Sequence, residues 1–233
     1  MTRTLKEILD EVSLESGMDT EAAYASSDID AVKRLVSMAN SAVRSLTKQT
    51  WQAMLQTYEF TLTSATSYSL PSDYKAMIPD TMYSDSHLWP VAFPTGAKTW
   101  AYLQASAGGT GTQDKIRLIG NKLEIYQPEA GKVIRVEYMS KNAVIDATGA
   151  TKKYFTADTD TFALDDDLLL METMWRYQRL LGLDFWQGTA MEAKDLLNVE
   201  LGNDAGAQTI QHDWDIGGIP YYDLWRPVPN TFV

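Results

Sequence analysis

Apolar residues recur at helical spacing in two segments near the start of the chain. The first runs from about residue 5 to Gly17, and Thr4 and Glu7 have the spacing of a capping box at its start. The second begins after Asp28, which we expect to cap it, and continues to about Thr50. Its apolar stripe consists of Ile29, Val32, Leu35, Val36, Ala39, Val43 and Leu46. Each pattern predicts an amphipathic helix with one buried face.

From about residue 55 to 164 the pattern changes to short runs in which apolar and polar residues alternate, as in half-buried strands. The link Gly120-Asn121 joins two such runs and predicts a β-hairpin, because glycine accepts the positive φ of a primed turn. A further strand is expected at 133–138 and a short helix at about 95–106. The middle of the chain is therefore predicted to be mostly β.

Helical spacing returns at Asp165. Residues 165–167 are three aspartates followed by an apolar run, and carboxylates favour a helix N-terminus through capping and the helix dipole. This helix is expected to lie centrally, to bury Trp175 and to break or bend at Gly182. A fourth helix has the apolar stripe Ala190, Ala193, Leu197 and Leu201 and is expected to end between Gly202 and Gly206.

The last segment, from His212 to Val233, has no helical period. Its three prolines and its glycine pair favour an extended arm. An exposed arm this rich in aromatic residues needs a surface to pack on, either its own core or another chain. The residues expected to anchor it are Trp214, Tyr221, Tyr222, Trp225 and Phe232.

These segments predict an α+β fold in four parts. The parts are N-terminal helices (1–54), a β-rich insertion (55–164), C-terminal helices (165–206) and the extended arm (207–233). About four helices would form one core, and the β insertion would lie between the second and the third of them. A length of 233 residues suits one compact core with one inserted subdomain.

Composition narrows the possible functions. The formal net charge of −11 gives the chain no electrostatic reason to bind nucleic acid or an anionic membrane. No cysteine is present, which suits a protein made in a reducing cytoplasm. The first residues lack the apolar run of a signal peptide, and no stretch approaches the roughly 18 apolar residues of a membrane helix. We expect no membrane partner.

The residues that could carry chemistry are few. His87 and His212 are the two histidines, and they form no helical metal-binding pair. No Gly-x-Ser-x-Gly elbow is present, and the loop Gly108–Thr112 has no lysine after it to make a phosphate cradle. Aspartates 165–167 could suggest a metal site, but helix capping accounts for them more simply. We therefore expect no catalytic, cofactor-binding or metal-binding residues.

Arg176 and Arg179 stand three positions apart and so share one helix face. Because arginine forms forked bonds with carboxylates, we expect the two side chains to pair with acidic groups, with pairing across a subunit boundary as one form of this. The alternative is an exposed, solvated face.

Four stretches of the sequence resemble the head-to-tail connector, or portal adaptor, proteins of tailed bacteriophages. Together they cover roughly residues 20 to 205, and their order and spacing carry the resemblance. They are Tyr68-Ser69-Leu70-Pro71-Ser72-Asp73-Tyr74 with Met77-Ile78; Leu88-Trp89-Pro90 leading to Trp100; Arg117-Leu118-Ile119-Gly120-Asn121-Lys122-Leu123-Glu124-Ile125 with Gly131 and Glu137-Tyr138; and Asp160, Phe162, Leu164, Leu168-Leu169, Trp175-Arg176, Arg179 and Gly182-Leu183-Asp184-Phe185.

The resemblance implies an adaptor-type helical core with a β insertion and a structural, non-catalytic role in the virion neck. Such adaptors assemble as a ring, typically of twelve copies, beneath the portal protein. The C-terminal arm commonly reaches the portal, and the ring extends the DNA channel and gives tail or nozzle proteins a docking surface. DNA would pass through without specific binding, and an acidic surface suits that. Two alternatives stay open: a tail-completion or nozzle component of the neck, and a carbohydrate-binding or glycan-cleaving virion protein that uses the aromatic and acidic residues.

Overall fold

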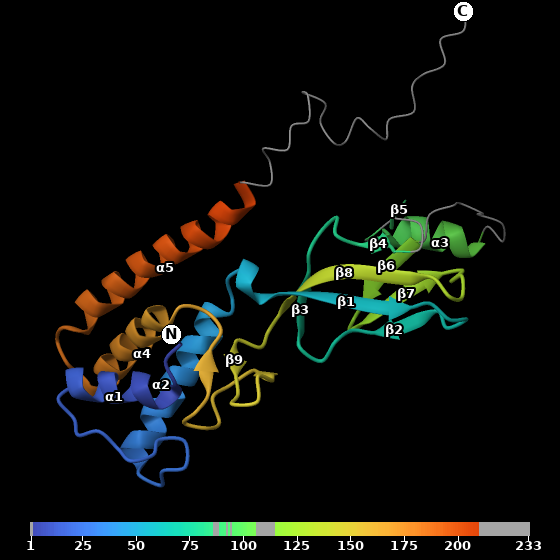
Figure 1. Cartoon of the computed structure of the whole chain (residues 1–233). Helices are drawn as coiled ribbons and strands as arrows, with labels where there is room; N and C mark the ends of the chain where they lie inside the picture. Colours follow the sequence, from blue (N-terminus) through green and yellow to red (C-terminus); the bar gives the residue numbers. More distant parts are fainter. Residues whose placement is uncertain (1, 86–88, 92, 94, 106–114, 210–233) are drawn as a thin grey trace, which may run out of the picture.

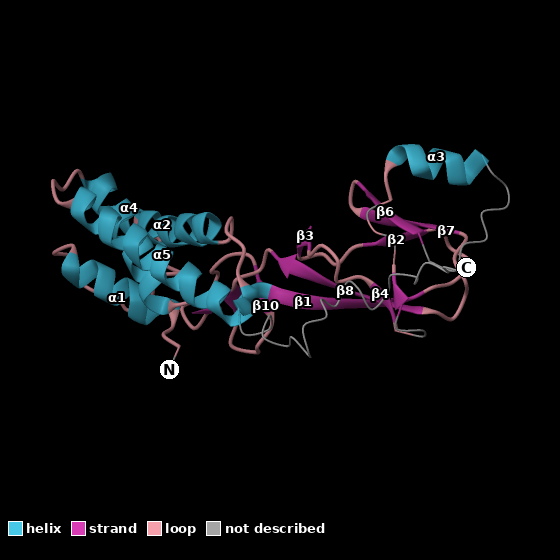
Figure 2. Ribbon diagram, turned by 90° about the horizontal axis from the view of Figure 1, so that it is seen from above, coloured by secondary structure: helices cyan, strands magenta, loops and turns pink. Residues whose placement is uncertain are grey.

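The computed structural model describes residues 2–85, 89–91, 93, 95–105 and 115–209. The fold is α+β, as the sequence predicts, with helices gathered at one end and antiparallel sheets at the other (Figure 1). Seen from above, the two ends form an elongated molecule joined through long strands (Figure 2). The predicted arm anchors from Trp214 to Phe232, the loop Gly108–Thr112 and both histidines lie outside the described residues.

The first helix, α1 (Leu5–Glu15), begins with the predicted capping box. The backbone N–H of Glu7 donates to Thr4 Oγ1 at 3.3 Å, and the backbone N–H of Thr4 donates to Glu7 Oε2 at 2.7 Å. These two bonds satisfy donors that a helix start otherwise leaves open.

The second helix, α2 (Asp30–Leu46), is shorter than predicted at both ends. Asp28 is not its cap: Ile29 holds that position without a side-chain bond, and Asp28 instead pairs with Lys33 at 3.0 Å. The helix ends at Leu46, and side chains outside it donate to the carbonyls at and just beyond this end. Trp51 Nε1 donates to the carbonyl of Leu46 at 2.9 Å, and Lys75 donates to those of Lys48 and Gln49.

The helix α4 (Asp166–Leu181) is capped as predicted. The backbone N–H of Leu168 donates to Asp165 Oδ1 at 2.9 Å, and Gly182 ends the helix with a φ of +74°. Trp175 is half-buried, which corrects the expectation that it lies inside the core. Its ring packs against Trp186, at the start of the next helix, with the ring centroids 6.4 Å apart.

The last helix, α5 (Trp186–Thr209), continues past its predicted end and through Gly202. A glycine inside a helix costs roughly 1 kcal/mol. Packing and hydrogen bonding on both sides of Gly202 offset this cost. Leu197 and Leu201 pack against the helical core, and Asp204 accepts a backbone bond from Gln52.

The four helices share one hydrophobic core, with α4 at its centre. α4 packs against α2, α1 and α5. The core also takes side chains from residues 139–162, namely Met139, Ala143, Val144, Phe155 and Phe162. A small sheet of β10 (Thr151–Lys152), β9 (Val144–Ile145) and β11 (Thr161–Phe162) carries part of this segment. The four-part division of the chain stays a prediction. Residues 139–162, which the division assigns to the β insertion, contribute side chains to the helical core.

The β-rich end has its own hydrophobic core between two sheets. In the larger sheet the long strand β8 (Val133–Ser140) pairs with β1 (Leu55–Thr61) on one edge and with β3 (Tyr74–Met77) and β4 (Tyr83–Ser84) on the other. Strand β5 (Trp89–Pro90) extends it beyond β4. The predicted hairpin forms the second sheet from β6 (Lys115–Ile119) and β7 (Lys122–Tyr126), joined by β2 (Ser67–Ser69).

The hairpin and the short helix α3 (Ala97–Ala105) follow the sequence pattern closely. Ile119 pairs with Lys122 across the two-residue link, and Gly120 has the positive φ, +59°, that the primed turn needs. Trp100 and Leu103 are the buried side chains of α3.

The strands β1 and β8 connect the two ends of the molecule. At one end of their ladder Leu55 faces Met139, which belongs to the helical core, and at the other Phe60 faces Ile134, which belongs to the β core. A short 3₁₀ turn, η1 (Gln52–Met54), leads from the helices into β1. Of the helices in the described part of the chain, none has both the length and the apolar character needed to cross a bilayer.

Candidate interaction surfaces

The three aspartates at the start of α4 have structural partners. Asp165 caps the helix, Asp166 accepts the backbone N–H of Arg3 at 2.7 Å, and Asp167 forms an ion pair with the Arg3 guanidinium. Among the residues that the structure describes, no group of three or more histidine, cysteine or acidic side chains is placed to hold a metal ion. Asp166 and Asp167 therefore fasten Arg3, which precedes α1, to the start of α4.

Two of the stretches that resemble adaptor proteins meet at Asp73. Its carboxylate accepts hydrogen bonds from Tyr138 Oη at 3.0 Å and from Ser140 Oγ at 2.7 Å. Burial, followed by the contact with Asp73, raises the pKa of Tyr138 to about 12. The backbone N–H of Lys141 also donates to the Asp73 carbonyl, at 2.8 Å. These bonds hold the turn before β3 against β8.

Asp160, from the fourth stretch, has a similar structural role in the helical end. Its side chain is fully buried, and Oδ2 accepts the backbone N–H groups of Thr156 and Ala157, both at 2.8 Å. Lys152 lies 2.7 Å from Oδ1 and compensates the buried charge. The Asp160 carbonyl accepts the N–H of Leu5 at 2.7 Å, which ties this loop to the start of α1.

Trp100, from the second stretch, has its ring face covered. Arg117 lies over the ring, 4.4 Å from its centroid, and is itself held by Glu124 through Nε at 2.8 Å and Nη2 at 2.6 Å. Tyr126 meets Trp100 edge-on at 6.2 Å. A hollow of about 600 Å³ opens beside these residues. A sugar-binding platform needs a free ring face, and the Trp100 face over which Arg117 lies is already occupied.

Arg176 and Arg179, which were expected to pair with carboxylates, have different contacts in the structure. Arg176 is largely buried, pairs with Glu172 one turn earlier in α4, and lies 4.3 Å from the Trp175 ring centroid. Arg179 is exposed and lies 5.3 Å from the ring centroid of Trp186. Arg176 thus has its carboxylate partner within its own helix. Pairing of either arginine across a subunit boundary stays a prediction.

Sequence reasoning missed a basic groove on the solvent side of α2. The groove has a volume of about 370 Å³ and is lined by Lys33, Val36, Ser37, Asn40, Arg44 and Tyr154. Two cations lie near the Tyr154 ring: Arg44 is 5.8 Å and Lys153 5.0 Å from its centroid. A hydrogen bond from Lys153, followed by the nearby positive charges, lowers the pKa of Tyr154. The groove is therefore electropositive although the whole chain is acidic.

Two regions of the helical end expose large apolar side chains. One lies at the turn between α4 and α5, with Leu180, Leu181 and Phe185 each about half exposed. The other is the outer face of α5, where Met191 is 69% and Val199 57% exposed. Exposed apolar groups gathered on one element are typical of contact surfaces.

The chain has a helical core with a β-rich insertion, and its motif residues have structural roles. Its exposed apolar and basic surfaces are available for partners. These features are typical of a protein that works as part of a larger assembly. The family model described as SU10 adaptor protein matches residues 3–213, and the chain belongs to this family of phage head–tail adaptors. No curated protein matches the chain.

Membership of the family makes the chain a structural adaptor and a component of the virion that contacts other head or tail proteins. The family is a structural one and not a family of enzymes. The acidic residues and the aromatic rings described above have packing and hydrogen-bonding roles that agree with this class.

Proposed function

We propose that the protein is a subunit of the adaptor ring that joins the capsid portal to the tail and extends the DNA channel. The observation that carries the proposal is the family match, which runs along residues 3–213 and so includes both the helical end and the β-rich end. In this proposal about twelve copies form a ring in the neck of the virion, one face of the ring contacts the portal, and the other contacts tail or nozzle proteins.

The C-terminal arm is the proposed portal anchor. Between residues 212 and 233 the sequence has five large aromatic side chains, Trp214, Tyr221, Tyr222, Trp225 and Phe232. Burying each in a partner groove contributes on the order of 1.5–3 kcal/mol. Docking of several such side chains would offset the entropy lost when the arm is fixed on the portal.

The test compares the full chain with a chain lacking residues 212–233. Circular dichroism and thermal unfolding first establish that both chains fold. Mixing each with purified portal rings, followed by sedimentation and cryo-EM, then measures binding. The proposal expects the full chain to form a ring on the portal and the shortened chain to lose portal binding. Binding of the full chain to pre-formed tails but not to portal rings would overturn the proposal in favour of a nozzle component.

A further inference from the structure

Two cations in or beside the basic groove have no acidic partner among the residues that the structure describes. Arg44 and Lys153 are exposed, and no carboxylate of the described residues lies within ion-pair distance of either. Lys33 pairs only with the fully exposed Asp28. Asn40 holds the segment that carries Tyr154 in place, since its side chain accepts the Phe155 N–H at 2.8 Å. The groove is thus a preformed site for a negatively charged partner.

The outer face of α5 has the complementary chemistry. One side of this helix carries Gly188, Met191, Glu192, Asp195, Val199 and Gly202. Within the described residues, Glu192 and Asp195 are exposed and form no ion pair. Nothing lies close to a side chain built at either glycine, so another backbone could approach closely there. A face that combines carboxylates, exposed apolar groups and glycines is suited to a protein partner.

The groove and the α5 face lie on opposite flanks of the helical end. α4 packs against α2 on one side and against α5 on the other, and Figure 1 shows α4 between them. One copy therefore cannot fill its own groove with its own α5. Two different patches on opposite flanks are the arrangement from which head-to-tail contacts build a closed ring.

We infer that the α5 face of one copy docks in the α2 groove of the next copy. Glu192 and Asp195 pair with Arg44 and Lys153 of the neighbour, and Met191 and Val199 pack on Val36 and the Tyr154 ring. The partner at this surface is thus a second copy of the chain. This inference rests on the proposed ring and adds to it which two surfaces meet between subunits.

The test uses full-length charge-reversal variants mixed with portal rings. One variant carries Arg44→Glu with Lys153→Glu, a second carries Glu192→Lys with Asp195→Lys, and a third carries all four changes. Cryo-EM and native mass spectrometry count the copies bound to each portal. We expect complete rings for the wild type, incomplete occupancy for each of the first two variants, and complete rings again for the third, because the reversed charges attract as before. A rise in salt should weaken the wild-type ring.

A matched control carries Lys98→Glu with Lys122→Glu. These exposed lysines lie on α3 and β7, away from the groove, and their reversal changes the net charge by the same amount. This control should form complete rings. If it loses them as well, net charge and not the groove is responsible, and the inference is overturned.

Three other outcomes separate this inference from the proposed function. Complete rings for all the variants would overturn the inference and leave the adaptor ring standing. A wild-type chain that binds no portal would overturn the proposed function itself. Retardation of duplex DNA by the full chain at physiological salt, abolished by Arg44→Glu with Lys153→Glu, would make the groove a phosphate-binding surface and overturn the docking of α5.

Discussion

The phenol of Tyr138 donates to both carboxylate oxygens of Asp73, at 3.0 Å to Oδ1 and 3.1 Å to Oδ2. Ser140, two residues further along β8, donates to Oδ2 as well. Tyr138 is 7% and Ser140 3% exposed, so water has little access to replace these bonds. The turn before β3, early in the sequence of the β insertion, is thereby fixed to β8, which comes late in it.

Replacing Asp73 with alanine should lower the free energy of unfolding by about 1–3 kcal/mol, because it leaves two buried hydroxyl groups without their acceptor. Urea unfolding followed by circular dichroism measures the change. Asp85→Ala is the control, since Asp85 forms a half-exposed pair with Arg135 at 3.5 Å and its loss should cost less than about 1 kcal/mol. An equal decrease in the free energy of unfolding for the two variants would show that the buried Asp73 bonds contribute no more than a half-exposed ion pair.

The raised pKa of Tyr138 predicts a loss of stability in strong base. The folded protein keeps the phenol proton to about pH 12, whereas the unfolded chain loses it near pH 10. The contribution of Tyr138 to stability is therefore complete below pH 10 and is lost as the pH rises from 10 to 12. Unfolding free energies measured across this range should fall less steeply for Tyr138→Phe than for the wild type.

Tyrosinate absorbance provides a second check on the same group. Tyr138→Phe should remove one late-titrating tyrosine from the absorbance curve of the folded protein. A titration curve for Tyr138→Phe that matches the wild type above pH 10 would contradict the assignment.

Two aromatic residues of the helical end should differ in their contribution to stability. Phe162 is fully buried in the helical core, so Phe162→Ala should cost about 3–5 kcal/mol. Trp175 is half-buried and contacts Arg176 and Trp186, so Trp175→Ala should cost clearly less, although sequence spacing alone predicts it as a core residue. Thermal and urea unfolding of both variants check the order, and a larger loss for Trp175→Ala would contradict it.

The features that the sequence predicts well are local ones. The capping box of Thr4 and Glu7, the Asp165 cap and the Gly120-Asn121 turn each depend on residues a few positions apart. The pairing of Arg176 with Glu172 is also local, one helical turn apart, and that spacing is the signal that could have found it.

The features that the sequence misses depend on distant contacts. The segment that follows α2 is held by Lys75, which lies on a strand of the β-rich end and bonds to the carbonyls of Lys48 and Gln49. The α2 groove requires Tyr154 to reach Arg44, and the basic residues that line it are hidden within an acidic composition. The arm anchors lie outside the described residues, so their role stays a prediction.

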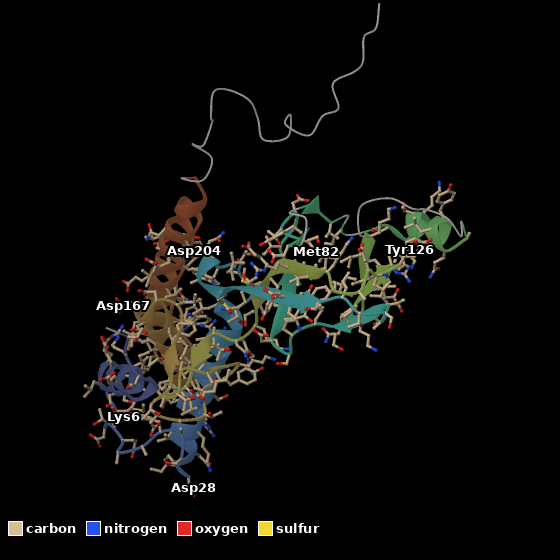
Figure 3. All side chains as sticks on the ribbon, turned by 45° about the vertical axis from the view of Figure 1, so that its right-hand side comes forward. Lys6, Asp28, Met82, Tyr126, Asp167 and Asp204 are labelled. Carbon is tan, nitrogen blue, oxygen red and sulfur yellow. The ribbon has the colours of Figure 1, made fainter. Side chains whose placement is uncertain are left out.

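Asp204 connects α5 to η1, the turn that leads from the helical end into the β-rich end. Its Oδ2 accepts the backbone N–H of Gln52, the first residue of η1, at 2.6 Å, and Figure 3 shows Asp204 on α5 beside the start of β1. Asp204→Ala leaves this N–H without its charged acceptor, so we expect a local loss of about 1.5 kcal/mol. Amide hydrogen exchange should then become about tenfold faster at Gln52, while the amides of β8 keep their protection.

The control for this change is Glu200→Ala, one turn earlier on α5. Glu200 accepts a bond from Asn203 within its own helix, at 3.3 Å, and among the described residues it forms no hydrogen bond or ion pair with the β-rich end or η1. It should therefore leave the exchange of the Gln52 amide unchanged, although both variants remove one carboxylate from the same helix. If Asp204→Ala also leaves that amide protected, the junction is held by the β1–β8 ladder alone. If it speeds exchange throughout β8, the bond stabilises the whole fold and not just the junction.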